Sequence, residues 1–432
     1  MATTESGIAR ANPPAIAAAV PAHDFAPDDW PVVDWLIRAG LGDADLATLF
    51  EGFCDKLLEV GLPVCRASIG MSTLHPLYRG YFYIWKRGES ITEATQQLHS
   101  ELPGEGWIHS PFHYMISNKL SHLRRRLAGP GAETDFPVLA EFARAGLTDW
   151  FANGFDLGWN HSQAARELLG AVATIATDCA EGFSDRDIER LNALLPVFAL
   201  TVKSTETDRM TRTVLATYIG SRVADRVLSG EIRRGSVESM RAVLVFSDLQ
   251  GFTALSDSLP RNELVPLLDD YLEALTRPIE ARGGQVLKFM GDGVLSVFDL
   301  DDPADDDTCS NGLCAAIDCA EAIAALNAER RGKGLTVTEV DIAVHLGEVL
   351  YGNVGSEGRL DFTVIGPAVN EVSRMELLCQ KLGERIVISE DFVSQSAADC
   401  RPALRSLGRH SLRGVAREAE LFGINKGDGL SA

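Results

Sequence analysis

The 432-residue sequence lacks an apolar run close to the roughly 20 residues that a membrane-spanning helix needs. It also lacks an excess of basic residues. Its formal charge is −21, which argues against a nucleic-acid or anionic-membrane partner, because such partners are bound by basic surfaces. The N-terminus has no basic segment followed by an apolar core, so no signal peptide is predicted. These absences favour a cytoplasmic protein without a membrane span.

The eight cysteines follow no disulfide or zinc-binding pattern. Cys309, Cys314 and Cys319 are spaced five residues apart, which spreads their side chains around a helix instead of stacking them on one face. Buried free thiols in a reducing compartment are therefore expected.

The length of the chain suits two or three domains. Residues 1–30 are predicted to be a disordered tail in front of them. Residues 31–205 mix helical and strand signals, which suits a small α/β sensor domain. Its predicted elements are helices near 43–60 and 184–203 and strands near 64–71, 79–86 and 170–177.

Residues 206–236 form a predicted helical segment between the two larger sections. An apolar stripe recurs there at helical spacing. The stripe consists of Met210, Val214, Tyr218, Val223 and Val227. A stripe of this length between domains is either a dimer seam or the face of a helix that packs on its own domain.

Residues 237–425 predict an α+β domain, followed by a short tail at 426–432. Strand and helix signals alternate in the order βαββαβ, as in a ferredoxin-like fold. The predicted elements are strand 241–247, helix 261–281, hairpin 285–298, helix 308–330, strand 339–346, strand 359–365 and helix 367–381. The acidic stretch 299–307 is expected to be a solvated loop and helix start.

Two aspartates in this section, Asp248 in VFSDLQGFT and Asp292 in KFMGDG, each end an apolar, β-rich run. Carboxylates at strand ends can hold two Mg²⁺ ions over a nucleoside triphosphate. The turn after Asp248 includes Phe252 and Thr253, and its backbone N–H groups can face phosphate oxygens if a helix follows. Gly293 suits a tight hairpin after Asp292.

An amide and a guanidinium follow in FTVIGPAVNEVSRMELL. Asn370 and Arg374 are four residues apart, so their side chains leave one face of a helix together. Such a pair can orient a sugar and neutralise charge that develops on a phosphoryl group. Lys288 lies four residues before Asp292, near the end of the preceding strand.

With these motifs, residues 240–425 closely resemble the class III nucleotidyl cyclases. The resemblance rests on VFSDLQGFT, KFMGDGVLSVF, AVHLGEVLYGNVG and FTVIGPAVNEVSRME, in this order. It implies metal binding by Asp248 and Asp292, with the carbonyl of Leu249 as a further ligand. It also implies the substrate contacts of five side chains. These are Lys288 and Thr363 on the base, Asn370 on the ribose, Arg374 on the transition state and Arg413 on the terminal phosphates.

The resemblance further implies ATP as substrate, two Mg²⁺ ions per site with Mn²⁺ as a substitute, and a homodimer whose sites combine residues of both subunits. Many members have aspartate where this chain has Thr363, and threonine there resembles a bicarbonate-responsive subgroup. Pro367 stands where an acidic residue is frequent. On hydrogen-bonding grounds alone, Lys288 and Thr363 admit adenine without excluding guanine.

Two alternatives to an adenylate cyclase stay open: a guanylate cyclase and a catalytically silent nucleotide-binding module. The presence of all six central site residues argues against the silent module. These are Asp248, Lys288, Asp292, Thr363, Asn370 and Arg374. A diguanylate cyclase would need a GG(D/E)EF-type turn, whereas this chain has GGQVLKF and MGDG.

Residues 31–205 loosely resemble GAF-type sensor domains, which implies a regulatory role. A small molecule or bicarbonate is a candidate regulator of the protein, without being assigned to this domain. His109 and His113 lie four residues apart but have no evident third metal ligand. Arg124, Arg125 and Arg126 are expected on a solvated helix face, and Asp185 near the start of the last helix as its cap. The tryptophans are more typical of an aromatic core than of a ligand pocket. They are Trp85, Trp107, Trp150 and Trp159.

Overall fold

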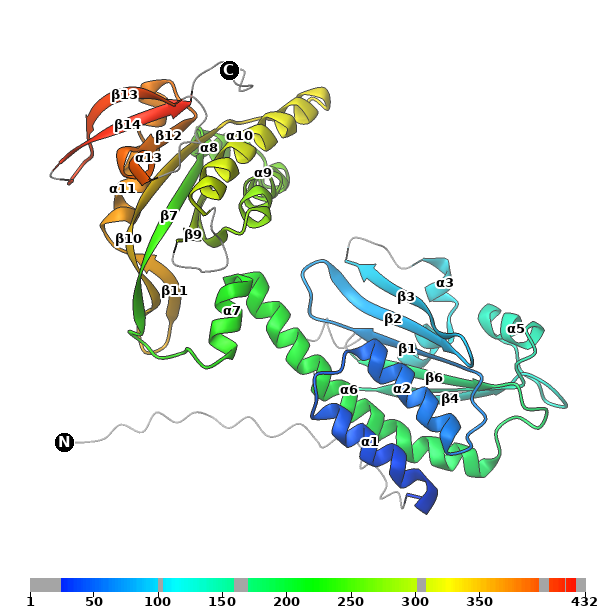
Figure 1. Ribbon diagram of the computed structural model, residues 1–432. Coiled ribbons are helices and arrows are strands. Elements are labelled where there is room, and N and C mark those ends of the chain that lie inside the picture. Colours follow the sequence, from blue (N-terminus) through cyan, green and yellow to red (C-terminus); the bar gives the residue numbers. More distant parts are fainter. Residues whose placement is uncertain are drawn as a thin grey trace, which may run out of the picture. The chain divides into compact units, whose positions relative to one another are not determined.

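The computed structural model describes residues 25–99, 104–158, 170–300, 308–395, 404–415 and 417–424. The chain divides into two compact units between Val214 and Leu215 (Figure 1). Residues 1–24 and 426–432 of the expected tails, most of the acidic stretch, and Trp159 lie outside the described residues.

The first unit is built on a six-stranded antiparallel sheet in the order β3-β2-β1-β6-β5-β4. Its strands are β1 Arg66–Ser72, β2 Tyr78–Lys86, β3 Ser90–Leu98, β4 His122–Arg126, β5 Asp149–Phe155 and β6 Ala171–Thr177. Its helices are η1 Pro27–Asp29, α1 Trp30–Gly40, α2 Leu46–Glu59, α3 Glu105–Ile108, α4 Pro111–Ser117, α5 Pro137–Arg144 and α6 Asp185–Ile219.

Both faces of this sheet are covered by helices. Successive side chains on β5 point to opposite sides, so neighbouring residues of this strand join different cores. Phe151 joins the core formed with α1, α2 and α6, in which the rings of Phe53 and Phe198 stack with centroids 4.3 Å apart. Trp150 joins the smaller core formed with α4 and α5. Trp85 and Trp150 are fully buried, in agreement with the aromatic-core prediction, whereas Trp107 is only partly buried.

Two local predictions for this unit are wrong. Arg124, Arg125 and Arg126 lie on strand β4, not on a helix, and Arg124 binds the fully buried Asp149 at 2.6 Å. A run of charged residues on a strand cannot be told from a helix face by charge alone. The cap of α6 is Ser184, whose hydroxyl accepts from the backbone N–H of Asp187, rather than Asp185.

The two histidines of HSPFHYM do not share one helix. His109 ends α3, and the new helix α4 starts after Ser110, whose hydroxyl accepts from the backbone N–H of His113. The serine cap interrupts the helix, so the i, i+4 relation that suggested a shared metal ligand does not arise.

The second unit has a sheet in the order β13-β14-β12-β10-β7-β9-β8, with β11 paired to β10. Its strands are β7 Val237–Leu249, β8 Gln285–Met290, β9 Gly293–Asp299, β10 Val340–Gly355, β11 Leu360–Ile365, β12 Ile386–Ser389, β13 Leu404–Ser411 and β14 Glu418–Ile424. Its helices are α7 Ser221–Leu228, α8 Phe252–Ser258, α9 Arg261–Ala281, α10 Thr308–Gly332, α11 Pro367–Glu376, α12 Cys379–Leu382 and α13 Glu390–Gln395.

The chain order β7-α9-β8-β9-α10-β10 matches the predicted βαββαβ order. Helices α9 and α10 bury Tyr271 and Ile323 in the core on one face of the sheet, and α11 buries Val372 in the core on the other. By length and composition alone α10 could cross a membrane, but its buried side chains, Leu313 among them, belong to the core of this unit.

The predicted helical segment 206–236 is not continuous. Helix α6 ends at Ile219, Gly220 has a φ of +85°, and α7 ends at Leu228. The apolar stripe is divided accordingly: Tyr218 is 82% exposed, whereas Val223 is buried. A left-handed glycine rotates the second helix away from the axis of the first, so one uninterrupted seam cannot form.

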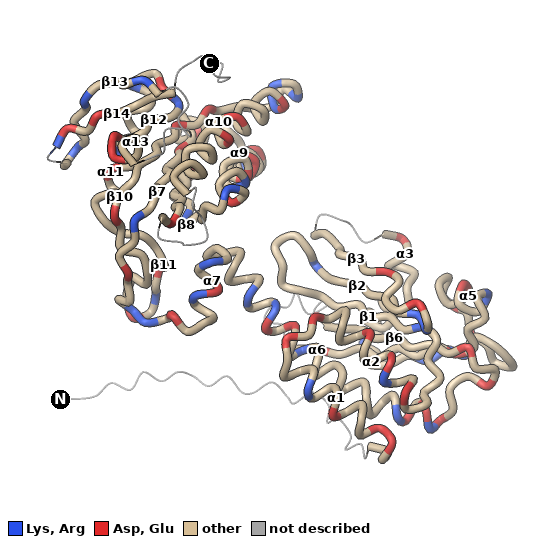
Figure 2. Tube along the Cα trace, viewed as in Figure 1, with Lys and Arg blue, Asp and Glu red and all other residues tan. Residues whose placement is uncertain are grey.

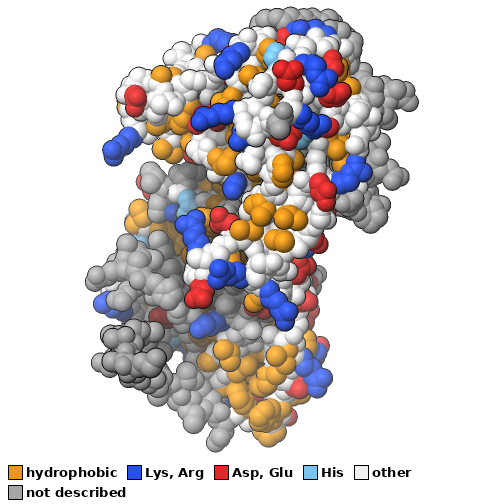
Figure 3. All heavy atoms as spheres, turned by 90° about the vertical axis from the view of Figure 1, so that its left-hand side faces the viewer, with side chains coloured by type: hydrophobic (Ala, Val, Ile, Leu, Met, Phe, Trp, Pro, Cys, Tyr) orange, Lys and Arg blue, Asp and Glu red, His pale blue; other side chains and the backbone are white. Residues whose placement is uncertain are grey.

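Charged residues of both signs occur along both units (Figure 2). On the face shown in Figure 3, acidic and basic side chains lie beside one another among hydrophobic ones. The net charge of −21 is therefore not gathered into a single acidic surface on that face.

Candidate active site

The two predicted metal ligands come from adjacent antiparallel strands. Asp248 lies near the end of β7, and Asp292 lies in the two-residue connection between β8 and β9. A Cβ on Gly293 would lie 2.8 Å from Oδ1 of Asp248, so the hairpin backbone approaches this carboxylate as only glycine permits. The predicted tight hairpin is present, and its left-handed turn residue is Gly291, with a φ of +71°.

Both carboxyl groups have raised pKa values. Burial raises the pKa of Asp248 to about 6, and the charges of Asp292 and Asp341 add to this effect. Burial also raises the pKa of Asp292, although hydrogen bonds from the backbone N–H groups of Asp292 and Leu249 lower it in part. Partly buried carboxylates that repel one another are a site that a cation would stabilise.

Sequence reasoning missed two further acidic residues of this cluster, Asp341 and Glu376. Asp341 is buried on β10, where it accepts hydrogen bonds from Gln250 at 2.7 Å and Gln380 at 2.9 Å. Burial raises the pKa of Glu376 to about 8, helped by the charges of the three aspartates. An acidic residue within the apolar strand EVDIAV was the available signal for Asp341.

A buried polar network holds the loop that follows Asp248. The hydroxyl of Tyr271 donates to Asn327 and accepts from the backbone N–H of Thr338 at 2.8 Å. Asn327 donates to the carbonyl of Thr338, whose own hydroxyl donates to the carbonyl of Gln250 at 2.7 Å. Every member of this network is buried or nearly so, so it fixes the loop between β7 and α8.

The remaining residues predicted at this loop lie where it turns into a helix. The side chain of Leu249 is buried in the core at the end of β7. Gly251, with a φ of +66°, precedes α8, which starts at Phe252. Phe252 packs partly on the core, and Thr253 is exposed. The helix that the predicted phosphate-facing turn requires is therefore present.

The two predicted base-contacting residues lie on strands that contact each other, β8 and β11. Lys288 is exposed on β8. Thr363 is buried on β11, where its hydroxyl has no hydrogen-bond partner among the described residues. A buried hydroxyl without a partner is costly, and a ligand that hydrogen-bonds to it would remove the penalty.

The predicted ribose and transition-state residues share helix α11. Asn370 is exposed and its side-chain amide lies 3.5 Å from the carbonyl of Gly366. The guanidinium of Arg374 lies next to Gly414, since a Cβ there would be 3.5 Å from one of its nitrogens. The exposed Arg413 precedes that glycine, so the structure brings Arg374 and the segment of Arg413 together.

Sequence comparison identifies the second unit. Residues 236–426 match the family of adenylate and guanylate cyclase catalytic domains. An adenylate cyclase of Anabaena cylindrica is 36% identical over 166 residues, which are 38% of this chain and 32% of that protein. Adenylate cyclase 1 of Rhizobium meliloti is 26% identical over 183 residues, 42% of this chain and 27% of that protein.

Among solved structures, an adenylyl cyclase from P. aeruginosa is 26% identical, with a TM-score of 0.41. The alignment covers 45% of this chain and all of that one. The two adenylate cyclases from Anabaena cylindrica and Rhizobium meliloti are much longer than the matched region, and this chain spans about a third of their length.

Proposed function

We propose that this protein, whose residues 236–426 form a class III nucleotidyl cyclase domain, is an adenylate cyclase that converts ATP into 3′,5′-cyclic AMP and pyrophosphate. The observation that carries the proposal is the carboxylate cluster of Asp248 and Asp292 beside Asp341, in which burial and mutual repulsion raise the pKa of Asp248 to about 6. The matched relatives named adenylate cyclase support the same activity.

The donor set suits two divalent cations, Mg²⁺ or Mn²⁺, because all of its ligand atoms are oxygens. Asp248, Asp292 and the carbonyl of Leu249 would hold them. Such ions, when bound, lower the pKa of the ribose 3′-hydroxyl and neutralise charge on the departing phosphates.

The side chains of the chain itself then orient the substrate and stabilise the transition state. Asn370 positions the ribose, so that the 3′-oxygen faces the α-phosphorus in line with the leaving pyrophosphate. Arg374 donates to the phosphoryl oxygens as charge builds on them, and Arg413 binds the terminal phosphates. An arginine in a comparable role is worth about 10³-fold or more in phosphoryl transfer.

The choice of ATP over GTP rests on Lys288 and Thr363. The ammonium of Lys288 can only donate, which suits the acceptor N1 of adenine. The hydroxyl of Thr363 can accept from the adenine amine, since it has no hydrogen-bond partner among the described residues. Guanine O6 also accepts, so a guanylate cyclase is the second candidate.

A homodimer with shared sites is the assembly that the family resemblance supports. Asn370 and Arg374 make their contacts at Gly366 and Gly414, not at the aspartate cluster. The sites would combine the aspartates of one subunit with the Asn/Arg pair of the other.

Residues 31–205 would act as a GAF-like regulatory domain. Their antiparallel sheet is covered on both faces. The last strand is followed by α6, a 35-residue helix that continues to the start of the second unit. A single helix that starts in this core and continues toward the cyclase domain suits the passage of a signal, and a small molecule or bicarbonate is the candidate regulator of the protein as a whole. A cytoplasmic location accords with this role.

The deciding experiment measures cyclic AMP and cyclic GMP formed by full-length protein from ATP and GTP, with Mg²⁺ and with Mn²⁺. We expect cyclic AMP with ATP and no product after Asp292→Ala. Cyclic GMP as the main product would favour the guanylate cyclase. No product from either nucleotide would favour the silent nucleotide-binding module.

A further inference from the structure

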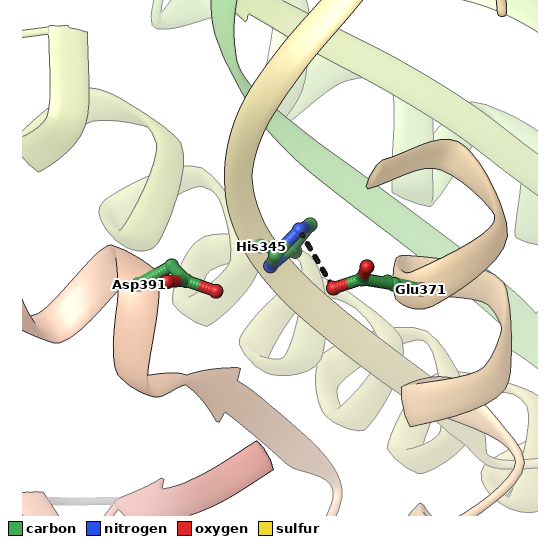
Figure 4. Close-up of side chains that lie close together, drawn as sticks. All are labelled: His345, Glu371 and Asp391. Carbon is green, nitrogen blue, oxygen red and sulfur yellow. Dashed lines mark ion pairs between the residues drawn. The ribbon is translucent and has the colours of Figure 1, made fainter. Parts of the chain in front are cut away.

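A second group of side chains that can bind metal lies in the cyclase unit, apart from the aspartate cluster. His345 of β10, Glu371 of α11 and Asp391 of α13 converge, and each offers a ligand atom within 4.8 Å of the others'. Figure 4 shows both carboxylates directed toward the imidazole from opposite sides. Three elements that are distant in sequence thus meet at one point.

His345 is already oriented as a ligand. Its side chain is buried, its Nδ1 lies 2.9 Å from the hydroxyl of Ser389, and its Nε2 lies 3.7 Å from Glu371. Burial lowers the pKa of His345 to about 4, which leaves the imidazole neutral near pH 7. Metal-bound histidines commonly donate their second ring N–H to a fixed acceptor, and Ser389 is placed to be that acceptor.

The two carboxylates are accessible to an ion from solvent. All three residues line one open pocket of about 570 Å³, which Glu348 and Arg417 also line. Arg417 binds Oδ2 of Asp391 at 2.6 Å, so the other carboxylate oxygen remains for an ion. The side chain of Arg417 is 63% exposed, so water screens its repulsion of a cation.

We propose that His345, Glu371 and Asp391 form a binding site for a divalent transition metal of the zinc class, with water as the fourth ligand. Imidazole nitrogen and carboxylate oxygen are both ligands that Zn²⁺ accepts, and three protein ligands leave a fourth position for water. Ligand atoms around a tetrahedral Zn²⁺ lie about 3.3 Å apart, so ligand atoms that are now up to 4.8 Å apart must approach by up to roughly 1.5 Å through side-chain rotation.

The imidazole separates this site from the all-oxygen aspartate cluster, because Mg²⁺ prefers oxygen ligands and Zn²⁺ accepts nitrogen. A bound ion would join α11 to β10 and α13. Since α11 also carries Asn370 and Arg374, the ion would restrain the helix that presents them. Binding itself does not depend on the proposed cyclase activity.

The test uses full-length Asp248→Ala/Asp292→Ala protein, which removes the competing aspartates. Zn²⁺ binding is measured by calorimetry, and Co²⁺ binding by its visible d–d absorption, whose intensity reports the coordination number of the bound ion. We expect one ion per chain. Adding Glu371→Gln and Asp391→Asn should weaken binding at least tenfold, whereas adding Glu348→Gln, in the same pocket but outside the trio, should not.

The variant Ser389→Ala tests whether His345, oriented by Ser389, binds the ion, or whether the carboxylates alone attract it. Loss of the hydrogen-bond partner of the second ring nitrogen weakens metal binding by about 10- to 100-fold. Circular dichroism checks that the variant is folded. The proposal is overturned if the aspartate-free protein binds no stoichiometric Co²⁺ or Zn²⁺, or if the Glu371→Gln/Asp391→Asn protein binds as tightly as the Glu348→Gln control.

Discussion

Asp341 lies directly opposite Asp248 in the antiparallel ladder between β7 and β10. Opposed residues in such a ladder project to the same side of the sheet, and like charges there destabilise it. The two glutamines bound to Asp341 hold its carboxylate in place, so its negative charge stays beside the proposed metal ligand. Without a cation, the folded protein therefore carries an unfavourable charge at this site.

This relationship predicts that Asp248→Asn stabilises the metal-free protein. The folded state raises the pKa of Asp248 to about 6, whereas an unfolded aspartate titrates near about 3.9. The folded state thus binds the proton more tightly, and stability that is present below about pH 4 is lost as the pH rises through about 6. In EDTA, Asp248→Asn should raise the melting temperature at pH 7 and leave it unchanged near pH 4.

The control for this experiment is Asp257→Asn on the exposed side of α8, which should shift neither value. Calorimetric scans between these pH values make the comparison. A lower melting temperature for Asp248→Asn at pH 7 would mean that the carboxylate stabilises the fold instead of serving a ligand.

Complementation tests the shared sites of the proposed homodimer. Asp248→Ala and Arg374→Ala should each be inactive. An equal mixture should recover about a quarter of wild-type activity, because half of the dimers are mixed and each has one intact site. Cyclic AMP formation after co-refolding is the measurement.

A mixture of Asp248→Ala with Asp292→Ala is the matched control and should stay inactive, since both changes damage the same half of a site. If the first mixture is also inactive while gel filtration shows dimers, the sites do not combine residues from two subunits.

The buried hydroxyl of Thr363 predicts a substrate-specific effect. Thr363→Val keeps the shape and removes an unpartnered polar atom, so the melting temperature should not fall. The KM for ATP should rise about tenfold, since one hydrogen bond is worth about 1–3 kcal/mol when its partner is left unpaired. The steady-state KM for ATP is compared with that for purine riboside triphosphate, which lacks the 6-amino group.

The variant should treat the two nucleotides alike, while the wild type should prefer ATP. Equal discrimination by both proteins would show that Thr363 does not contact the base amine.

Two adjacent arginines in the first unit form ion pairs that should contribute very differently to the free energy of unfolding. Arg124 pairs with the fully buried Asp149, which also accepts from the backbone N–H of Phe183. Arg124→Ala should therefore cost about 3–5 kcal/mol of unfolding free energy, because it leaves the buried charge of Asp149 without its cation. Arg125→Ala breaks pairs with the exposed Glu133 and Asp135 and should cost at most about 1 kcal/mol.

Urea unfolding followed by tryptophan fluorescence compares these two variants. Similar losses would contradict the assignment of a buried ion pair between β4 and β5.

The sequence by itself determined the elements whose signals are local. The bounds predicted for α9, 261–281, are those of the structure, because a helix of 21 residues repeats its periodicity many times. The hairpin of β8 and β9 was likewise evident from its apolar runs and glycines. Asp248 and Asp292 could be recognised because each lies at the end of such a run and within a motif.

Only the tertiary structure decided which distant residues meet. Asp341 reaches Asp248 through strand register, and His345 reaches Glu371 and Asp391 through the packing of α11 and α13. Local patterns carry no register between strands that are 90 residues apart, nor the side of a helix that faces a given strand. For the same reason the charged strand β4 was mistaken for a helix, since its partner Asp149 comes from the neighbouring strand and not from the local sequence.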